Sequence, residues 1–300
     1  MRSPRVHLLA GPSCLLLALA WGCCEAPGEP FGRLRIELAS VTLGYPALVE
    51  VTSTWEPIAP LDAVAPPVVF VHLLGASPGV ERTFDHPFPA AWRVGETTTY
   101  PIQLWQTALG PPLAPGSYRL SLGIYDPASG RRWPLAVDGA EVDDQEYVVA
   151  TVEVPEEPES APEATFTGDW HPVGPSGDRQ IFASRWLGDE GALEFSHLAG
   201  PLAVAMSLDL PDQGDARHRM VLAEGASSPE LTVASECTEE TLRLAAWGRG
   251  DLRLTLVPPA GASTCAVRLA PNFVHLDLVD LSRSSVKLDR LTWNEVAAGP

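Results

Sequence analysis

The residues that usually carry chemistry are not arranged in a recognised motif in this chain. No H-E-x-x-H, Walker A or G-x-G-x-x-G sequence occurs among the 300 residues, which excludes the common zinc-protease and nucleotide-binding motifs. A catalytic site would have to combine residues that are far apart in the sequence, and the sequence names no such set. We therefore predict that the protein is not an enzyme and needs no cofactor. A glycoside hydrolase with two paired carboxylates is the alternative, but the sequence names no such pair.

Three groups of acidic residues could bind a cation. Asp85 and His86 are adjacent and Glu81 is nearby, but no further ligand can be placed, and a surface loop is the alternative. A second cluster contains Glu141, Asp143, Asp144 and Glu146. It lacks the D-x-D-x-D-G pattern with a closing glutamate, so a solvated turn is favoured over a calcium loop. The better calcium candidate consists of Asp209, Asp212 and Asp215. A hairpin loop is favoured there too, and no metal site is predicted.

Tryptophan gives the main indication of a ligand. An exposed indole ring can stack on the apolar face of a sugar. Four tryptophans of the C-terminal part of the chain are candidates: Trp170, Trp186, Trp247 and Trp293. The alternative is that each of these rings fills the hydrophobic core.

Composition indicates which elements must position these residues. The chain has 30 prolines and 25 glycines, and long helices are not expected because proline removes a backbone donor and glycine weakens helices. An apolar fraction of 45% is sufficient for packed cores.

The formal net charge is −18, with a single lysine, Lys287. Such a surface repels phosphate backbones, so nucleic acid is not an expected partner.

Residues 1–22 resemble a secretion signal. Two arginines precede an apolar run that is too short to span a bilayer. A small residue stands directly before Cys23, as in a bacterial lipobox, although Ala20 replaces the usual leucine. The resemblance implies cleavage before Cys23 and attachment of a lipid to its sulfur. Cleavage after Ala20, which would give a freely secreted chain, is the alternative, and in both cases the mature chain folds outside the cytoplasm.

Two cysteines, Cys237 and Cys265, remain for the folded part of the chain. In an oxidising compartment they most simply form one disulfide, worth about 3–4 kcal/mol in the chain-entropy model. Half of a metal site is the alternative, but no CxxC or HxxxH spacing supports it.

Strand patterns separated by turn residues fill the N-terminal part of the chain. The expected strands cover residues 34–38, 47–55, 68–74, 97–104, 118–124 and 147–154. Such a series of short strands predicts an antiparallel β-sandwich. The successive sequences VFVHLL, GE and LAPGSYRLSLGIYDPASGRR resemble Ig-like or fibronectin-like modules of bacterial surface and membrane glycosyltransferase-type proteins. This resemblance covers residues 34–154 and implies a non-catalytic appendage.

A linker separates this region from a second series of strands. Residues 155–164 read PEEPESAPEA, and a segment so rich in proline and glutamate cannot form a core. Beyond it, apolar and polar residues alternate again, most clearly at residues 202–210 and 252–256, which predicts another β-sandwich. The ending FVHLDLVDLSRSSVKLDRLTW resembles the last strands of galactose-binding-like jelly rolls.

The sequence therefore predicts an all-β protein of two β-sandwich domains. The expected parts are a signal peptide at 1–22, a tether at 23–33, an Ig-like sandwich at 34–154, a linker at 155–164 and a jelly-roll-like sandwich at 165–300. We expect an exported lipoprotein of the cell envelope, anchored in the outer membrane, with a structural or protein-interaction role. Carbohydrate binding by exposed tryptophans of the second sandwich is the alternative. The expected partners are the membrane and an envelope protein or glycan.

Overall fold

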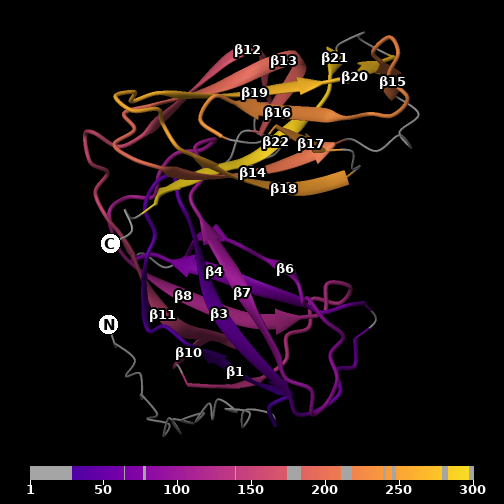
Figure 1. The fold of residues 1–300 in the computed structure, drawn as a ribbon. Coiled ribbons are helices and arrows are strands. Elements are labelled where there is room, and N and C mark those ends of the chain that lie inside the picture. The colour runs from indigo at the N-terminus through magenta and orange to yellow at the C-terminus, as the bar shows by residue number, and fades with distance from the viewer. Residues whose placement is uncertain are drawn as a thin grey trace, which may run out of the picture.

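The computed structural model is built of β-strands, and no helix occurs among the residues that it describes (Figure 1). These residues are 29–63, 65–76, 79–138, 140–173, 184–210, 218–238, 241–244, 248–278 and 283–296. The prediction of an all-β protein is confirmed. The predicted signal peptide with Cys23 lies outside the described residues, as do Trp247, Asp212 and Asp215. No described segment is a helix with the length and apolarity that a bilayer crossing requires.

Residues 29–154, here called the first half, form two sheets. One sheet has the order β7 (Thr98–Trp105), β3 (Leu48–Pro57), β1 (Gly32–Ile36) and β9 (Leu135–Val137). The other has the order β10 (Ala140–Asp143), β11 (Glu146–Val154), β8 (Gly116–Tyr125), β4 (Val68–Leu74) and β5 (Val80–Thr83), with β2 (Ser40–Thr42) on β11 and β6 (His86–Pro87) on β4. Both sheets contribute to one hydrophobic cluster, whose largest fully buried side chains are Trp55 and Trp133.

Residues 163–296, the second half, form a larger and a smaller sheet. The larger has the order β17 (Leu242–Leu244), β16 (Leu231–Ser235), β19 (Cys265–Pro271), β13 (Ser184–Ser196), β22 (Lys287–Glu295), β14 (Leu202–Leu210) and β18 (Gly248–Leu256), with β12 (Glu163–Val173) on β13. The smaller has the order β15 (His218–Leu222), β20 (Phe273–Asp277) and β21 (Arg283–Ser284). The predicted disulfide between Cys237 and Cys265 is present, buried in the hydrophobic cluster of this half.

The region around β12 and β13 differs most from the pattern expected from the sequence. The sequence pattern predicts two short strands at residues 181–186 and 192–196, but β13 is one strand over Ser184–Ser196 and pairs with β12; the Gly/Pro/Ser-rich loop predicted after Pro172 lies largely outside the described residues. Glycines that suggest breaks in the sequence here allow close backbone approach. Gly168 has a φ of +88°, and a Cβ at that position would lie 2.9 Å from the carbonyl oxygen of Glu190. The pairing is therefore irregular between Gly168 and Trp170 but continues on both sides.

A loop of the first half, residues 106–113, enters the hydrophobic cluster of the second half. Leu109 is buried there among side chains of the large sheet. Thr107 Oγ1 accepts a hydrogen bond from the N–H of Leu291 at 3.0 Å and lies 3.2 Å from the carbonyl oxygen of the same residue. The N–H of Ala108 also donates to this carbonyl, at 2.9 Å. The loop is thus bonded to the backbone of β22.

One side chain stabilises the loop itself, and another joins the two halves. The amide of Gln106 donates to the carbonyl oxygens of Leu43 and Gly44 and accepts from the N–H of Leu113 at 2.7 Å. The amide of Asn294, on β22, bonds to both backbone polar groups of Leu48. The bonds of Gln106 fix the loop within the first half, whereas those of Asn294 join the two halves, which are seen stacked in Figure 1.

Candidate functional site

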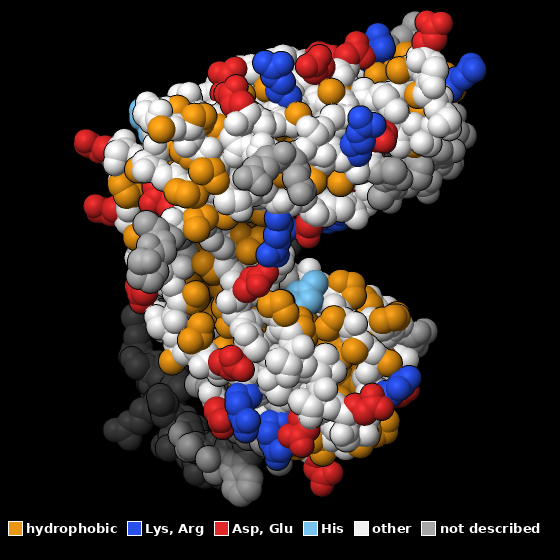
Figure 2. All heavy atoms as spheres, viewed as in Figure 1, with side chains coloured by type: hydrophobic (Ala, Val, Ile, Leu, Met, Phe, Trp, Pro, Cys, Tyr) orange, Lys and Arg blue, Asp and Glu red, His pale blue; other side chains and the backbone are white. Residues whose placement is uncertain are grey.

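A cleft of about 460 Å³ lies between the two halves, and Figure 2 shows the molecule hollowed there. Small-molecule sites typically have volumes of ~300–1,000 Å³. Most of the side chains that line the cleft come from the first half: Thr83, Phe84, Asp85, His86, Pro89, Tyr100, Pro101, Gln103 and Trp105. Arg249 and Arg290 close it from the second half.

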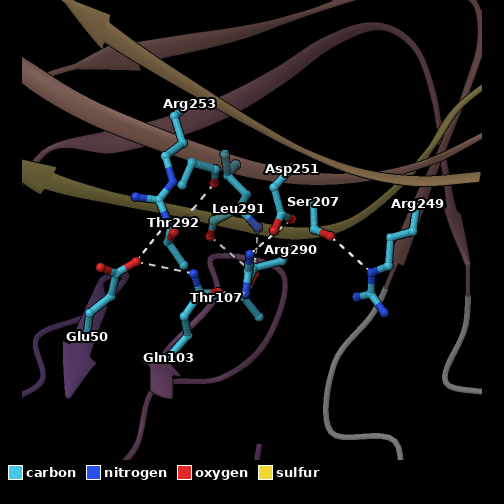
Figure 3. A network of polar contacts seen from close by, with 11 residues as sticks. Glu50, Gln103, Thr107, Ser207, Arg249, Asp251, Arg253, Arg290, Leu291 and Thr292 are labelled. Atoms are coloured by element: carbon cyan, nitrogen blue, oxygen red, sulfur yellow. Dashed lines mark hydrogen bonds and ion pairs between the residues drawn. The ribbon is translucent and has the colours of Figure 1, made fainter. Parts of the chain in front are cut away.

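Strand alternation explains why the second half presents charge to the cleft. On β18, Leu252 and Leu256 are buried in the core. The intervening positions therefore point away from the core, and Figure 3 shows Arg249, Asp251 and Arg253 directed toward the first half. On β22, two strands away from β18 across β14, Arg290 reaches the same space.

Arg290 connects the two walls (Figure 3). Its Nη1 donates to Oε1 of Gln103 at 3.2 Å, and its Nη2 pairs with Oδ1 of Asp251 at 3.1 Å. The guanidinium carbon lies 5.8 Å from the centre of the Trp105 ring, within the range of a cation–π contact. Burial lowers the pKa of Arg290, Asp251 opposes this effect, and the neighbouring Arg249 adds to it. Positive charge is therefore concentrated at this wall.

Arg253 and Arg249 differ in how their charge is balanced. Arg253 pairs with Glu50 across the junction at 2.9 Å, and this hydrogen bond lowers the pKa of Glu50. Arg249 donates from Nε to Oγ of Ser207 at 3.1 Å. It forms no ion pair with a described carboxylate, including Asp209, which lies opposite it on β14. Arg249 is thus a cleft cation without an acidic partner in the described part of the chain.

His86 and Tyr100 form part of the opposite wall. Nδ1 of His86 lies 3.0 Å from the carbonyl oxygen of Phe84, which can only accept, so this nitrogen carries the proton. Nε2 then accepts from the Tyr100 hydroxyl at 3.1 Å when the ring is neutral. Burial raises the pKa of Tyr100, which keeps the phenol neutral. Both ring nitrogens of His86 are engaged, so the imidazole is held in place and does not offer a free base.

Asp85, predicted with His86 as a possible ligand pair, bonds elsewhere. Its Oδ1 accepts from the N–H of Val71 at 3.0 Å and lies 3.7 Å from Nε2 of His72. Glu81 is exposed on β5 and does not line the cleft. In the described part of the chain, no group of three histidine, cysteine, aspartate or glutamate side chains is placed to hold a metal ion.

A buried polar cluster on the sheet that contains β4, β8 and β11 consists of a serine, a histidine and a glutamate, the residue types of a serine hydrolase triad. Their hydrogen-bonding order differs from that of a triad. Ser121 and His72 both bond to the same carboxylate oxygen of Glu146, the histidine at 3.0 Å. In a catalytic triad the imidazole stands between the hydroxyl and the acid and takes the serine proton. Here the carboxylate stands between them, so the cluster stabilises the sheet and is not arranged for nucleophilic attack.

The expectation that the chain contains no hydrolase motif is wrong at one place, because G-x-S-x-G occurs at residues 75–79. The nucleophile elbow of hydrolases places this pattern between a strand and a helix. Residues 75–79 instead connect β4 to β5, two neighbouring antiparallel strands. The match therefore lacks the structural context that gives the motif its function. Ser77 itself lies outside the described residues.

Of the four tryptophans predicted to bind sugar, Trp247 lies outside the described residues, and Trp170 and Trp186 stand one register position apart on the paired strands β12 and β13, so they face opposite sides of the pair. Trp293 is 7% exposed and packs edge-to-face on Phe195 in the core. Trp170 is half-buried, and its Nε1 donates to the carbonyl oxygen of Ala192 at 3.2 Å. Trp186 is half-buried on β13. The tryptophan that lines the cleft, Trp105, was not among the predicted residues.

The described side chains of the acidic cluster around the turn before β11 face in different directions. Asp143 and Asp144 are exposed at the turn before β11, whereas Glu146 is directed inward to His72. Asp209 is the described member of the predicted calcium group, at the end of β14.

The cleft therefore combines aromatic rings, amide and hydroxyl groups, and an arginine without an acidic partner among the described residues. This combination suits a ligand that has both an apolar face and polar groups. Comparison with models of known protein families and with the sequences of curated proteins found no match.

Proposed function

We propose that the protein is a non-catalytic envelope protein that binds a saccharide in the cleft between its halves. The observation that carries this proposal is the placement of the aromatic rings of Trp105 and Tyr100 in one cavity with the hydroxyl group of Thr83 and the guanidinium group of Arg249. A sugar ring has C–H faces that pack on aromatic rings and hydroxyl groups that need donors and acceptors. The cleft offers both kinds of contact.

The proposed architecture consists of two β-sandwich domains, the first Ig-like and the second jelly-roll-like, joined by residues 155–164. The loop at residues 106–113 supports a fixed relation between them, because Leu109 belongs to the second hydrophobic cluster. A binding site between two bodies loses affinity if the bodies must be ordered on binding. The docked loop would remove much of this cost.

The proposed location is the outer face of a membrane, reached through a signal peptide and a lipid on Cys23. The composition agrees with export, since the two cysteines of the folded part form a disulfide. A cleft on an anchored protein would be available to an envelope glycan or to a glycosylated envelope protein. The protein would then perform the structural or interaction role expected from the sequence by binding its partner in the cleft.

The test is a glycan array probed with the full chain extracted in detergent. We expect binding that Trp105→Ala abolishes. Trp170→Ala is the matched control, since this half-buried tryptophan of the second half does not line the cleft. Loss of binding with Trp170→Ala but not with Trp105→Ala would move the site to the second sandwich. Absence of any glycan binding would refute the proposal.

A further inference from the structure

Resting on the proposed function, we propose that the saccharide is acidic and that a sugar carboxylate binds Arg249 while the ring of the same or the next sugar unit packs on Trp105. Both residues line one cavity, from opposite halves of the molecule. The ligand class is therefore an oligosaccharide that contains a hexuronic acid.

The first argument is the geometry of Arg249. Ser207 holds the Nε of the guanidinium at 3.1 Å and so restricts its orientation. The two Nη groups form no hydrogen bond or ion pair with a described residue, and the contact drawn for Arg249 in Figure 3 is the one from Nε to Ser207. Two parallel N–H donors match the two oxygens of a carboxylate, which gives arginine its preference for planar, bidentate recognition.

The second argument is the local balance of charge. The protein carries a net charge of −18, and each other arginine at this junction has a carboxylate within ion-pair distance, Glu50 for Arg253 and Asp251 for Arg290. Arg249 lacks one among the described residues. A negatively charged ligand would give Arg249 the anionic partner that Arg253 and Arg290 have within the protein.

Arg290 strengthens the positive potential of the same wall. Its Nε is buried without a hydrogen-bond partner among the described residues, and a buried donor left unpaired is unfavourable. Asp251 and Gln103 satisfy its Nη groups only. The unsatisfied Nε lies too deep for direct contact, so Arg290 acts through its field and Arg249 through contact.

The negative charge of Asp85, the acidic residue of the cleft lining, is partly balanced by groups of the first half. Asp85 accepts a hydrogen bond from the backbone of Val71 and lies 3.7 Å from His72. A backbone N–H donor reduces the repulsion that this carboxylate exerts on a bound anion. Asp85 therefore reduces the preference for an acidic ligand without reversing it.

The test compares acidic sugars with neutral sugars of the same shape. Trisaccharides of galacturonic acid and of glucuronic acid, and their methyl esters, are titrated calorimetrically into the full chain in detergent. We expect the acids to bind about 10- to 100-fold more tightly than the esters, the range of a charge-assisted hydrogen-bond pair. We also expect this preference to decline at high salt.

Two variants complete the design. Arg249→Gln should remove the preference for the acid, so that the acid and the ester bind with about the same affinity. Arg243→Gln is the control, since Arg243 is an exposed arginine of the second half that pairs with Glu230 and does not line the cleft. Equal binding of acid and ester, with loss on Trp105→Ala, would overturn this inference and leave the proposed saccharide site intact. Absence of binding of either form, with no other glycan bound on the array, would overturn both.

Discussion

Replacing Leu109 with alanine should destabilise the second half of the molecule, although Leu109 belongs to the first half in the sequence. The side chain is 7% exposed and packs in the second hydrophobic cluster. Leu109→Ala removes about three buried carbons at ~0.8 kcal/mol each and leaves a cavity, so we expect a loss of about 2.5–4 kcal/mol in the free energy of unfolding.

The assay combines urea denaturation with hydrogen exchange read by mass spectrometry. Denaturation gives the total loss of stability, and exchange shows where it falls. We expect faster exchange in β14 and β22, which contribute side chains to the cluster around Leu109. Exchange in β4 and β8, which contribute to the other cluster, should change little.

Leu113→Ala is the matched control for this prediction. Leu113 lies four positions later in the same loop and is equally buried, but in the cluster of the first half. Its truncation should accelerate exchange in β4 and β8. If Leu109→Ala affected the same strands as Leu113→Ala, or cost less than about 0.5 kcal/mol, the loop would not dock into the second half as described.

Three further predictions concern acid stability, the disulfide and the anchor. The hydrogen bond from His72 lowers the pKa of Glu146 below its ordinary value of 4.5. The stability that this carboxylate provides is therefore complete above that pH and is lost as the pH falls through the lower folded pKa. The difference in melting temperature between the wild type and Glu146→Gln should accordingly narrow in acid, and a difference that widens there would contradict this assignment. Cys237→Ser with Cys265→Ser should lower the free energy of unfolding by about 3–4 kcal/mol, as expected for a loop closed at a sequence separation of 28. A reductant should then have no further effect on the double variant. Cys23→Ala should move the protein from the membrane to the soluble fraction, and continued membrane association would exclude the lipid anchor.

The strands were largely predictable because alternation is a local property of the sequence. Strand β14 coincides with the predicted residues 202–210, and β4 with residues 68–74. Each has apolar residues at the spacing that a packed sheet requires. Strand β12 was missed because Gly168 and Pro172 suggest a loop when tertiary pairing is ignored. Its partner strand β13 determines its conformation.

The candidate site was much less predictable, because it depends on which faces of distant strands meet. Alternation indicates that Arg249 and Arg253 point away from the core of the second half, but nothing local indicates that Trp105 lies opposite them. The available signal was the apolar Leu109 in a loop rich in turn residues, directly after the strand that ends at Trp105. An apolar side chain in such a loop suggests docking against another surface. The sequence pattern instead suggested Trp293 as a sugar-binding residue, but this side chain is buried in the hydrophobic core.

The structure of the protein determined with a bound uronic acid trisaccharide is the most direct test of the central claim. We expect the sugar between the two halves, with a carboxylate at the guanidinium of Arg249 and a ring against Trp105. A sugar bound at Trp170 or Trp186, or elsewhere outside the cleft, would contradict the account.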